Sequence, residues 1–381
     1  MSPSPITPPA EISARYIMIG GFLGAGKTTA VARLAAALQA RGLRAGLITN
    51  DQGSGLVDTT VLRARGFATE EIPGGCFCCR FNSLVDAAGK LTTATRPDVF
   101  IAEPVGSCTD LVATVTYPLR RIYGDRFTIA PLSVLVDPQR ALRVFGFGEG
   151  RAFSDKVLYI YRKQLEEADL VIINKCETVS AADLARLRDA LSREFPHAEI
   201  LNASARNGDG LEEWFGRLLS HEQVARKAME VDYEVYADGE ARLGWLNATV
   251  QLGAAVEFDA NAVLEHLARG IQQRLDAAGG EVAHLKMTFS PDGGLNDLAA
   301  VTLVRSDFVP ELSLRLNQRC GAGQLILNLR AEAAPDALKA AVEMSLAALP
   351  VQFSGLRAGL EHLEHFRPGK PQPTHRLLSP A

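Results

Sequence analysis

The stretch YIMIGGFLGAGKTTAVARL, residues 16–34, decides the fold of the amino-terminal half of this 381-residue chain. It contains the pattern G-x-x-x-x-G-K-[ST], with a strand-like apolar run before it and a helix-like run after it. The glycines let backbone N–H groups curl around phosphate oxygens without a Cβ clash, and the start of the helix adds partial positive charge. The stretch therefore predicts a P-loop that binds a nucleoside triphosphate.

Two side chains of this loop have expected roles. Lys27 should reach the β- and γ-phosphates, and the hydroxyl of Thr28 should bind Mg²⁺. The alternative is a chance match in a glycine-rich turn, which the strand–loop–helix context disfavours. The predicted nucleotide-binding residues of the loop are Gly21, Gly24, Ala25, Gly26, Lys27, Thr28 and Thr29.

Short runs rich in Val, Ile and Leu alternate with helix-like segments over the first two hundred residues. This alternation predicts an α/β fold of the P-loop NTPase type, with a doubly wound, mainly parallel sheet and ligands at the carboxyl ends of the strands. The expected strands are 16–20, 45–49, 99–102, 132–136, 170–173 and 199–203, and the expected helices are 28–40, 154–168 and 181–195.

The pattern changes after residue 219 and predicts a smaller α+β carboxyl-terminal domain. A charged, helix-like stretch at 220–232 comes first, and strands and helices then mix. The expected strands are 245–252, 284–289, 298–304 and 324–331, and the expected helices are 259–275 and 335–349. The predicted divisions are a disordered leader 1–14, a P-loop domain 15–222, an α+β domain 223–366 and a loose Pro-rich tail 367–381.

The bulk composition limits the classes of function. The chain is 47% hydrophobic and 22% charged with a net charge of −4, so it lacks the basic footprint of a nucleic-acid or membrane-surface protein. No apolar run approaches the ~18 residues that span a bilayer. The polar, Pro/Ser-rich start does not resemble a signal peptide, and we expect a cytoplasmic protein without nucleic-acid or membrane partners.

Two later segments predict which base is bound. DLVIINKCE, residues 169–177, ends a strand with Asn174, Lys175 and Glu177, where GTPases carry N-K-x-D and the acid pairs with the edge of guanine. Glu177 keeps the carboxylate but adds a methylene. NASARNGDGLEEW follows, and Ser204 and Ala205 lie where GTPases place a second base-contacting loop. A polar turn after a buried strand is the alternative interpretation.

Two acids are expected at the phosphate end. Glu103 and Gly106 form an E-x-x-G in DVFIAEPVGSCTDL, so the carboxylate should act on Mg²⁺ and the glycine should let the backbone approach a γ-phosphate. An ordinary exit from a strand is the alternative. Asp51, in TNDQG, is expected to position Mg²⁺ or the attacking water, or else is a turn residue. The predicted catalytic residues are Lys27, Glu103 and Asp51, with Thr28 and Glu103 on Mg²⁺.

The sequence GGCFCC, residues 74–79, holds three of the six cysteines of the chain. Thiolates suit Zn²⁺ or Co²⁺, and Cys76, Cys78 and Cys79 would fill three of four tetrahedral positions, with 76 and 78 pointing the same way in an extended segment. An open fourth position suits delivery of the metal. A closed structural zinc site and a redox or buried thiol group are the alternatives. The other cysteines, at positions 108, 176 and 320, are expected to be isolated, packed residues.

The motifs GGFLGAGKTT, ITNDQG, GGCFCC, AEPVG, QLEEADLVIINK and NASARNGDGL occur in this order. Together they resemble the CobW family of P-loop GTPases, part of a metal-handling group with HypB, UreG and MeaB; the resemblance covers about residues 16–219. It implies a weak GTPase that delivers a metal or cofactor to a client protein through C-x-C-C. In that group Glu replaces Asp in the third GTPase motif, as Glu103 does here. Asp51 and Glu177 depart from the family's usual Glu and Asp.

The expected function is therefore a slow GTPase that acts as a metallochaperone or metal-insertion factor, with GTP, Mg²⁺ and Zn²⁺ or Co²⁺ as its ligands. The turnover should be slow because the sequence reveals no arginine finger. The expected partner is a client metalloprotein, and self-association stays open. An ATP-dependent small-molecule kinase and a zinc-stabilised, non-enzymatic interaction protein are the alternatives. The carboxylate Asp137 is read as support for Mg²⁺ or as a cap, and His362 and His365 as surface or packed residues rather than ligands.

Overall fold

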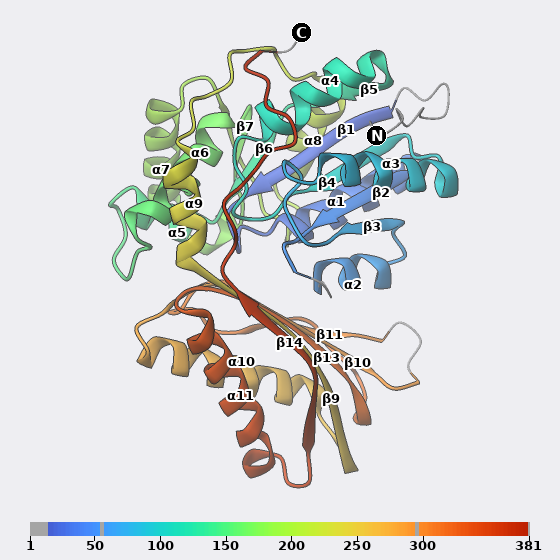
Figure 1. The fold of residues 1–381 in the computed structure, drawn as a ribbon, viewed down its shortest axis with the longest axis vertical. Coiled ribbons are helices and arrows are strands. Elements are labelled where there is room, and N and C mark those ends of the chain that lie inside the picture. Colours follow the sequence, from blue (N-terminus) through green and yellow to red (C-terminus); the bar gives the residue numbers. More distant parts are fainter. Residues whose placement is uncertain (1–13, 54–56, 294–296, 380–381) are drawn as a thin grey trace, which may run out of the picture.

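The computed structural model describes residues 14–53, 57–293 and 297–379, and it has two units stacked along the long axis of the molecule (Figure 1). The leader predicted at 1–14 lies outside the described residues except for Ala14, which begins the first strand. No helix in the described ranges is both long enough and apolar enough to cross a bilayer.

The first unit is built on a parallel sheet in the order β3-β2-β4-β1-β6-β7-β8, with β5 paired beside β1. All of its pairings are parallel, as predicted. The strands are β1 (Ala14–Gly21), β2 (Ala45–Asn50), β3 (Thr69–Ile72), β4 (Val99–Glu103), β5 (Phe127–Ile129), β6 (Ser133–Val136), β7 (Leu170–Ile173) and β8 (Glu199–Asn202).

Helices cover both faces of this sheet. Along β1, Tyr16 and Met18 belong to one hydrophobic core, whereas Ile17 and Ile19 belong to another, because successive side chains point to opposite faces. Burial on both faces explains the continuous apolar runs of the sequence. The helices are α1 (Lys27–Ala40), α2 (Val57–Ala64), α3 (Phe81–Thr95), α4 (Tyr117–Tyr123, after a π-helical turn Val112–Thr116), α5 (Pro138–Val144), α6 (Asp155–Glu167), α7 (Ala181–Glu194) and α8 (Leu211–Ser220).

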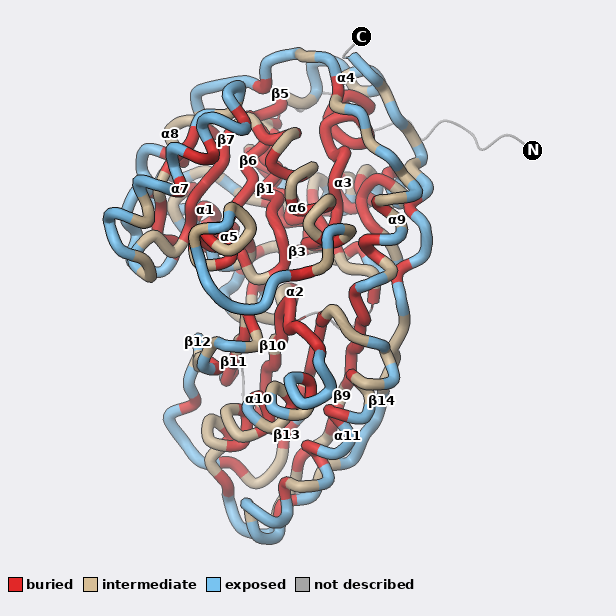
Figure 2. Tube along the Cα trace, turned by 90° about the vertical axis from the view of Figure 1, so that its left-hand side faces the viewer, coloured by how far each residue is buried: buried red, intermediate tan, exposed pale blue. Residues whose placement is uncertain are grey.

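The second unit is an antiparallel sheet in the order β12-β11-β10-β13-β9-β14, with two helices packed on one face (Figure 1). Figure 2 shows buried backbone running through the sheets of both units and towards the zone where they meet. The elements are β9 (Leu243–Phe258), α10 (Ala260–Ala277), β10 (Glu281–Pro291), β11 (Ala299–Leu303), β12 (Glu311–Leu314), β13 (Cys320–Glu332), α11 (Pro335–Gln352) and β14 (Arg357–Phe366).

The other face of this second sheet is turned towards the first unit. On β10, Leu285, Met287 and Phe289 enter the core under the helices, so the alternating residues His284 and Lys286 point the other way. The same alternation on β13 and β9 brings polar and aromatic side chains to the junction between the units. They include Trp245, Asn247, Asn328 and Arg330.

The helix expected at 220–232 is not formed. That segment is extended, and helix α9 (Tyr233–Arg242) begins after it, capped by the Asp232 side chain, which accepts from Glu234 N and Val235 N. The extended backbone pairs with the first unit instead, since Gln223 N donates to Ile129 O at 2.9 Å. Tertiary hydrogen bonds therefore override the helical propensity of this charged stretch.

The chain after β14 also differs from the expectation of a loose tail. It returns along the first unit, where Thr374 N donates to Cys78 O at 2.8 Å and Leu377 N donates to Ala113 O at 2.9 Å (Figure 1). Its prolines favour an extended backbone whose N–H groups are free to bond elsewhere. The two histidines expected to be surface or packed residues, His362 and His365, lie on strand β14.

Candidate functional site

The carboxyl ends of the first sheet open into a cavity of about 620 Å³, roofed by β10, β11 and β12 of the second unit. Residues from both units line it, so the site lies at a domain junction, where ligand sites are common. The lining residues of the first unit include Gly24, Gly26, Lys27, Thr28, Thr29, Asp51, Asp58, Glu103, Gly106, Lys175 and Ala205.

The P-loop connects β1 to α1 in a form that requires glycine at two points. Gly21 has φ +128°, and a Cβ there would lie 2.4 Å from Leu135 O. Gly26 has φ +93°, and a Cβ there would lie 2.4 Å from Asn174 Nδ2. Since helix α1 begins at Lys27, its first N–H groups and the glycine loop face the cavity together.

Lys27 is folded against its own loop. Its Nζ donates to Gly21 O at 2.9 Å and to Phe22 O at 3.4 Å. Burial lowers the pKa of Lys27, while the nearby Glu103 carboxylate acts in the opposite direction. The side chain lies where the sequence predicts the phosphate-binding lysine.

Three oxygen-bearing side chains meet beside the loop and form what we call the oxygen cluster: Thr28, Asp58 and Glu103. Thr28 Oγ1 lies 2.8 Å from Asp58 Oδ1 and 3.0 Å from Glu103 Oε1, and its single O–H can donate to one of them at a time. Glu103 Oε2 is buried and has no hydrogen-bond partner among the described residues. Burial, followed by the Asp58 charge, raises the pKa of Glu103 to about 7. Hard oxygen donors with one carboxylate oxygen unsatisfied fit Mg²⁺.

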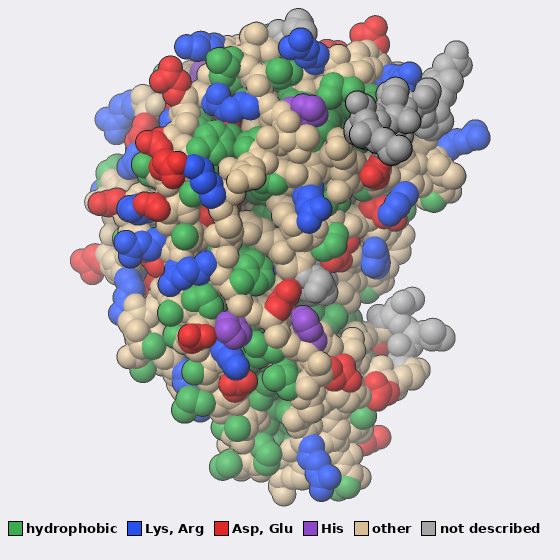
Figure 3. All heavy atoms as spheres, viewed as in Figure 1, with side chains coloured by type: hydrophobic (Ala, Val, Ile, Leu, Met, Phe, Trp, Pro, Cys, Tyr) green, Lys and Arg blue, Asp and Glu red, His purple; other side chains and the backbone are tan. Residues whose placement is uncertain are grey.

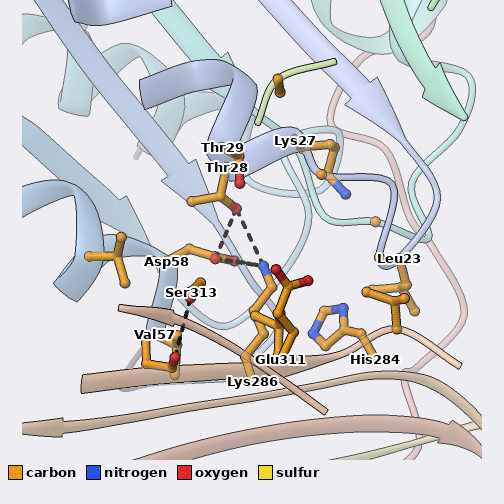
Figure 4. A pocket seen from close by; sticks show the side chains of 18 of the residues that line it. Leu23, Lys27, Thr28, Thr29, Val57, Asp58, His284, Lys286, Glu311 and Ser313 are labelled. Carbon is orange, nitrogen blue, oxygen red and sulfur yellow. Dashed lines mark hydrogen bonds and ion pairs between the residues drawn. The ribbon is translucent and has the colours of Figure 1, made fainter. Parts of the chain in front are cut away.

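A lysine from the second unit reaches the same cluster (Figure 4). Lys286 Nζ lies 2.6 and 2.8 Å from the two carboxylate oxygens of Asp58 and 3.3 Å from Thr28 Oγ1. Although burial opposes it, the Lys286 ammonium lowers the pKa of Asp58. Neither Asp58 nor Lys286 belongs to a sequence motif, and the sequence analysis did not single them out.

At the base end, Asn174 joins two loops. Its Nδ2 donates to Ala25 O at 2.8 Å, and its Oδ1 accepts from Ala205 N at 2.9 Å. Lys175, with φ 58°, donates to Gly24 O at 2.7 Å. Ser204 is buried and accepts from Asn207 N, so it shapes its loop. Glu177 is exposed and lies outside the cavity lining.

The acids Asp51 and Asp137 pair with arginines of the second unit. Asp51 accepts from Gln52 N and Gly53 N, as a turn residue does, and its carboxylate lies 2.9 and 3.1 Å from Arg330 Nη2. Asp137 caps α5 through Arg140 N and lies 3.3 Å from Arg305 Nη1. The cap expected of Asp137 is therefore formed, and Lys175 also pairs with this carboxylate at 2.9 Å. Its support of Mg²⁺ stays a prediction.

The three predicted thiols converge. Cys76 Sγ lies 2.7 Å from Cys78 Sγ and 3.3 Å from Cys79 Sγ, and the latter two are 3.7 Å apart. The expectation of an extended segment was wrong. The segment forms a turn before α3, closed by hydrogen bonds from Cys79 N and Arg80 N to Cys76 O. Turning gathers three thiols, whereas an extended chain would send the middle side chain to the other face.

Cys108 is buried, as expected, but it is not isolated. Its thiol lies close enough to Cys76 and Cys78 to shift the pKa values of both. These contacts, with Cys108 first and then Cys78 and Cys79, hold the pKa of Cys76 well below its usual value. A thiolate is the form that binds metal, so Cys76 is prepared for ligation.

The loop from Glu103 to Cys108 runs directly from the oxygen cluster to the thiols. Between them, Ser107 Oγ donates to Glu240 Oε1 at 2.7 Å, and Gln52 Nε2 donates to the same oxygen at 3.3 Å. Glu240, on α9, was not identified from the sequence; burial, followed by the Cys76 charge, raises its pKa well above the usual range. Segments after β2 and β4 therefore meet at one buried carboxyl group beside the thiols.

Residues 15–202 match the model of a family described as CobW/HypB/UreG, nucleotide-binding domain. The domain formed by residues 15–202 belongs to the CobW/HypB/UreG family. The resemblance stated from the motifs is thereby confirmed, and the sheet described above confirms the predicted P-loop α/β fold.

Curated relatives of this chain carry metal-related names. It is 31% identical to "Zinc chaperone CobW" of Sinorhizobium sp, covering 50% of this chain and 59% of the relative. It is 30% identical to "Zinc chaperone YeiR" of Escherichia coli, covering 43% and 47%. It is 25% identical to "Zinc-regulated GTPase metalloprotein activator 1" of Dictyostelium discoideum, covering 49% and 45%. The chain thus spans about half the length of these relatives.

Proposed function

We propose that this chain is a GTP-hydrolysing metallochaperone that binds Zn²⁺ or Co²⁺ at Cys76, Cys78 and Cys79 and releases it to a client protein according to the bound nucleotide. The observation that carries this proposal is the short loop from Glu103 to Cys108, which connects the oxygen cluster to the thiols. The names of the relatives, two zinc chaperones and a zinc-regulated GTPase, support the same class of function.

The nucleotide would bind along the P-loop. Lys27 would hold β- and γ-phosphate oxygens, and Lys175 and Ala205, which line the cavity, would contact the base. Asn174 is buried behind them and would hold the P-loop and the Ala205 loop together. Glu177 would have to move inwards from its exposed position to pair with guanine, so the base preference needs a direct measurement. Asp51 lines the cavity and is our candidate for positioning the attacking water.

The oxygen cluster fits Mg²⁺, with Thr28 and Glu103 as its protein ligands. When bound, Mg²⁺ supplies neutralisation of the charge that develops on the phosphates. Gly106 would bring its backbone to the terminal phosphate, and the loop that follows it reaches Cys108. A shift of this loop upon hydrolysis would therefore change the positions of the side chains around the thiols.

The metal is cargo in this proposal. Three thiols leave one tetrahedral position for a client ligand, whereas a closed set of four ligands holds zinc structurally. In a tetrahedral site with a Zn–S distance of about 2.3 Å, the sulfurs lie about 3.8 Å apart. The sulfurs of Cys76 and Cys78, now 2.7 Å apart, would therefore have to move away from each other when zinc binds. The free thiols favour a reducing compartment, and we propose the cytoplasm.

The test is a set of metal titrations. Zn²⁺ and Co²⁺ are titrated into the full chain with Mg·GDP, a non-hydrolysable Mg·GTP analogue, or the adenine counterparts, and the metal affinities are compared. We expect guanine nucleotides alone to change the affinity, by about tenfold between the two states, a coupling of about 1.4 kcal/mol.

Two variants separate the parts of the proposal. Lys27→Ala should abolish hydrolysis, and Cys78→Ser should weaken metal binding while sparing hydrolysis without metal; Cys320→Ser, a buried cysteine of the second unit, is the matched control. Equal metal affinity in all nucleotide states, or full affinity in Cys78→Ser, would overturn the proposal.

A further inference from the structure

Lys286 is the feature of the nucleotide cavity that the family resemblance does not account for. It comes from β10 of the second unit, and its ammonium group lies on Asp58 and Thr28, two of the three members of the oxygen cluster (Figure 4). Its side chain is only 18% exposed, and it borders the same cavity as Lys27. A cation from the carboxyl-terminal domain therefore stands among the oxygens that fit Mg²⁺.

Lys286 is more than a link between the two units. Other contacts already hold the two units together: the ion pair between Arg330 and Asp51, and the hydrogen bond from Val57 N to Asn328 Oδ1 at 2.9 Å. Arg330 and Asn328 lie on β13, which pairs with β10. Lys286 instead points into a cavity, where a charged side chain is desolvated and has to find a partner.

The charges of the site limit what can be bound at one time. Asp58 and Glu103 carry the negative charge of the cluster, and Lys27 and Lys286 are close enough for their charges to interact. A divalent cation on the same oxygens would repel an ammonium group 2.6 Å from Asp58. The phosphates would then be the nearest strong anion for the displaced side chain, because they share the cavity.

We propose that Lys286 and Mg²⁺ exchange at the oxygen cluster, where Thr28 is common to both, and that the released Lys286 binds the terminal phosphate of the nucleotide. The inference rests on the proposed nucleotide function and extends it. It makes β10 of the carboxyl-terminal domain a sensor of the terminal phosphate, since Lys286 can hold that phosphate only in the triphosphate state.

The test measures binding by the full chain rather than turnover. The affinities of fluorescent GDP and of a non-hydrolysable GTP analogue are measured over a range of Mg²⁺ concentrations for the parent, Lys286→Met and Lys286→Arg. In Lys286→Met we expect about tenfold weaker binding of the triphosphate analogue, from loss of a charge-assisted contact, with GDP affinity unchanged. The Mg²⁺ concentration for half-maximal binding should fall several-fold, because a competing cation is gone.

Controls keep the outcomes distinct. Lys339→Met removes an exposed lysine of α11 and should change neither quantity. Lys286→Arg keeps the positive charge and should still bind the triphosphate analogue in preference to GDP. This variant tests the inference if Lys286→Met folds poorly. Unchanged selectivity and unchanged Mg²⁺ dependence in Lys286→Met would overturn the inference. Failure of the parent to bind any guanine nucleotide would instead overturn the proposed function.

Discussion

At the scale of single residues, the site depends on side chains held in positions that cost free energy. Glu103 keeps a buried carboxylate oxygen without a partner among the described residues, and Cys76 is a buried thiol whose pKa is lowered by neighbouring thiols. Such groups persist where a ligand satisfies them. Glu103 lies at the start of the loop to Cys108, and Cys76 lies near the end of that loop.

Cys108→Ser is the residue-scale prediction. Cys108 lies close enough to lower the pKa of Cys76, so the variant should weaken Zn²⁺ binding by about tenfold and reduce the difference in affinity between nucleotide states. Competition with a zinc chelator in Mg·GDP and in the Mg·GTP analogue measures both quantities. Cys176→Ser, a half-buried cysteine outside the cluster, serves as the comparison. Zinc affinity equal to that of the parent would show that Cys108 only fills space.

At the scale of elements, the tail is the segment whose placement matters most for the thiols. Gln372 N donates to Cys79 Sγ at 3.2 Å, and Thr374 Oγ1 donates to Cys79 O at 3.1 Å. Arg376 anchors the tail on the buried carboxylate of Asp110 at 2.7 Å. The strap formed by residues 370–378 therefore covers the most exposed member of the cluster.

Removing residues 368–381 is the prediction for this element. Without the strap, Cys79 should react with a thiol reagent several-fold faster, and loaded zinc should pass to a chelator more rapidly. The reason is that the reagent no longer has to wait for the strap to open before it reaches the cluster. Labelling followed by mass spectrometry of the Cys76–Cys79 peptide measures the first effect. A chain lacking only residues 380–381 is the control; equal labelling rates in the two truncated chains would refute the idea.

At the scale of the whole molecule, the second unit covers the cavity at the carboxyl ends of the first sheet like a roof. Three basic side chains of the second unit, Lys286, Arg305 and Arg330, pair with acids of the first unit. Figure 3 shows positive and negative side chains interspersed on the outer surface in the Figure 1 view. Ion pairs of the opposite polarity also join the units, from Arg143 to Asp307, from Arg151 to Asp276 and from Arg206 to Glu311. This arrangement fixes where the roof sits on the phosphate end of the sheet.

Arg330→Met tests the junction. Arg330 is fully buried between Trp245, whose ring centroid is 4.0 Å away, and the Asp51 carboxylate. Its loss should cost about 3–5 kcal/mol, because it leaves a carboxylate unpaired at the junction. Urea unfolding followed by tryptophan fluorescence should then show the two units separating into distinct transitions. The exposed Arg357→Met should unfold as the parent does, and identical curves for both variants would argue against this role.

Local sequence was sufficient for the P-loop, the parallel sheet and the grouping of three cysteines, because each depends on contiguous residues. It did not predict the turn that brings the three thiols together, since an extended segment was expected there. A phosphate loop needs glycines at set spacings between a strand and a helix, and buried parallel strands read as unbroken apolar runs. Local sequence did not predict the course of residues 220–232 or of the tail, since both are held by hydrogen bonds to distant backbone.

The composition of the site itself was decided by the packing of the second sheet. Asp58 and Lys286 are far apart in sequence and meet only because β10 alternates, sending Leu285 to the core and its neighbour to the cavity. Glu240 and Cys108 likewise reach the thiols only when α9 and the loop after β4 are in place. Charges that pair across a domain junction leave no local pattern, because their partners are chosen by tertiary contact.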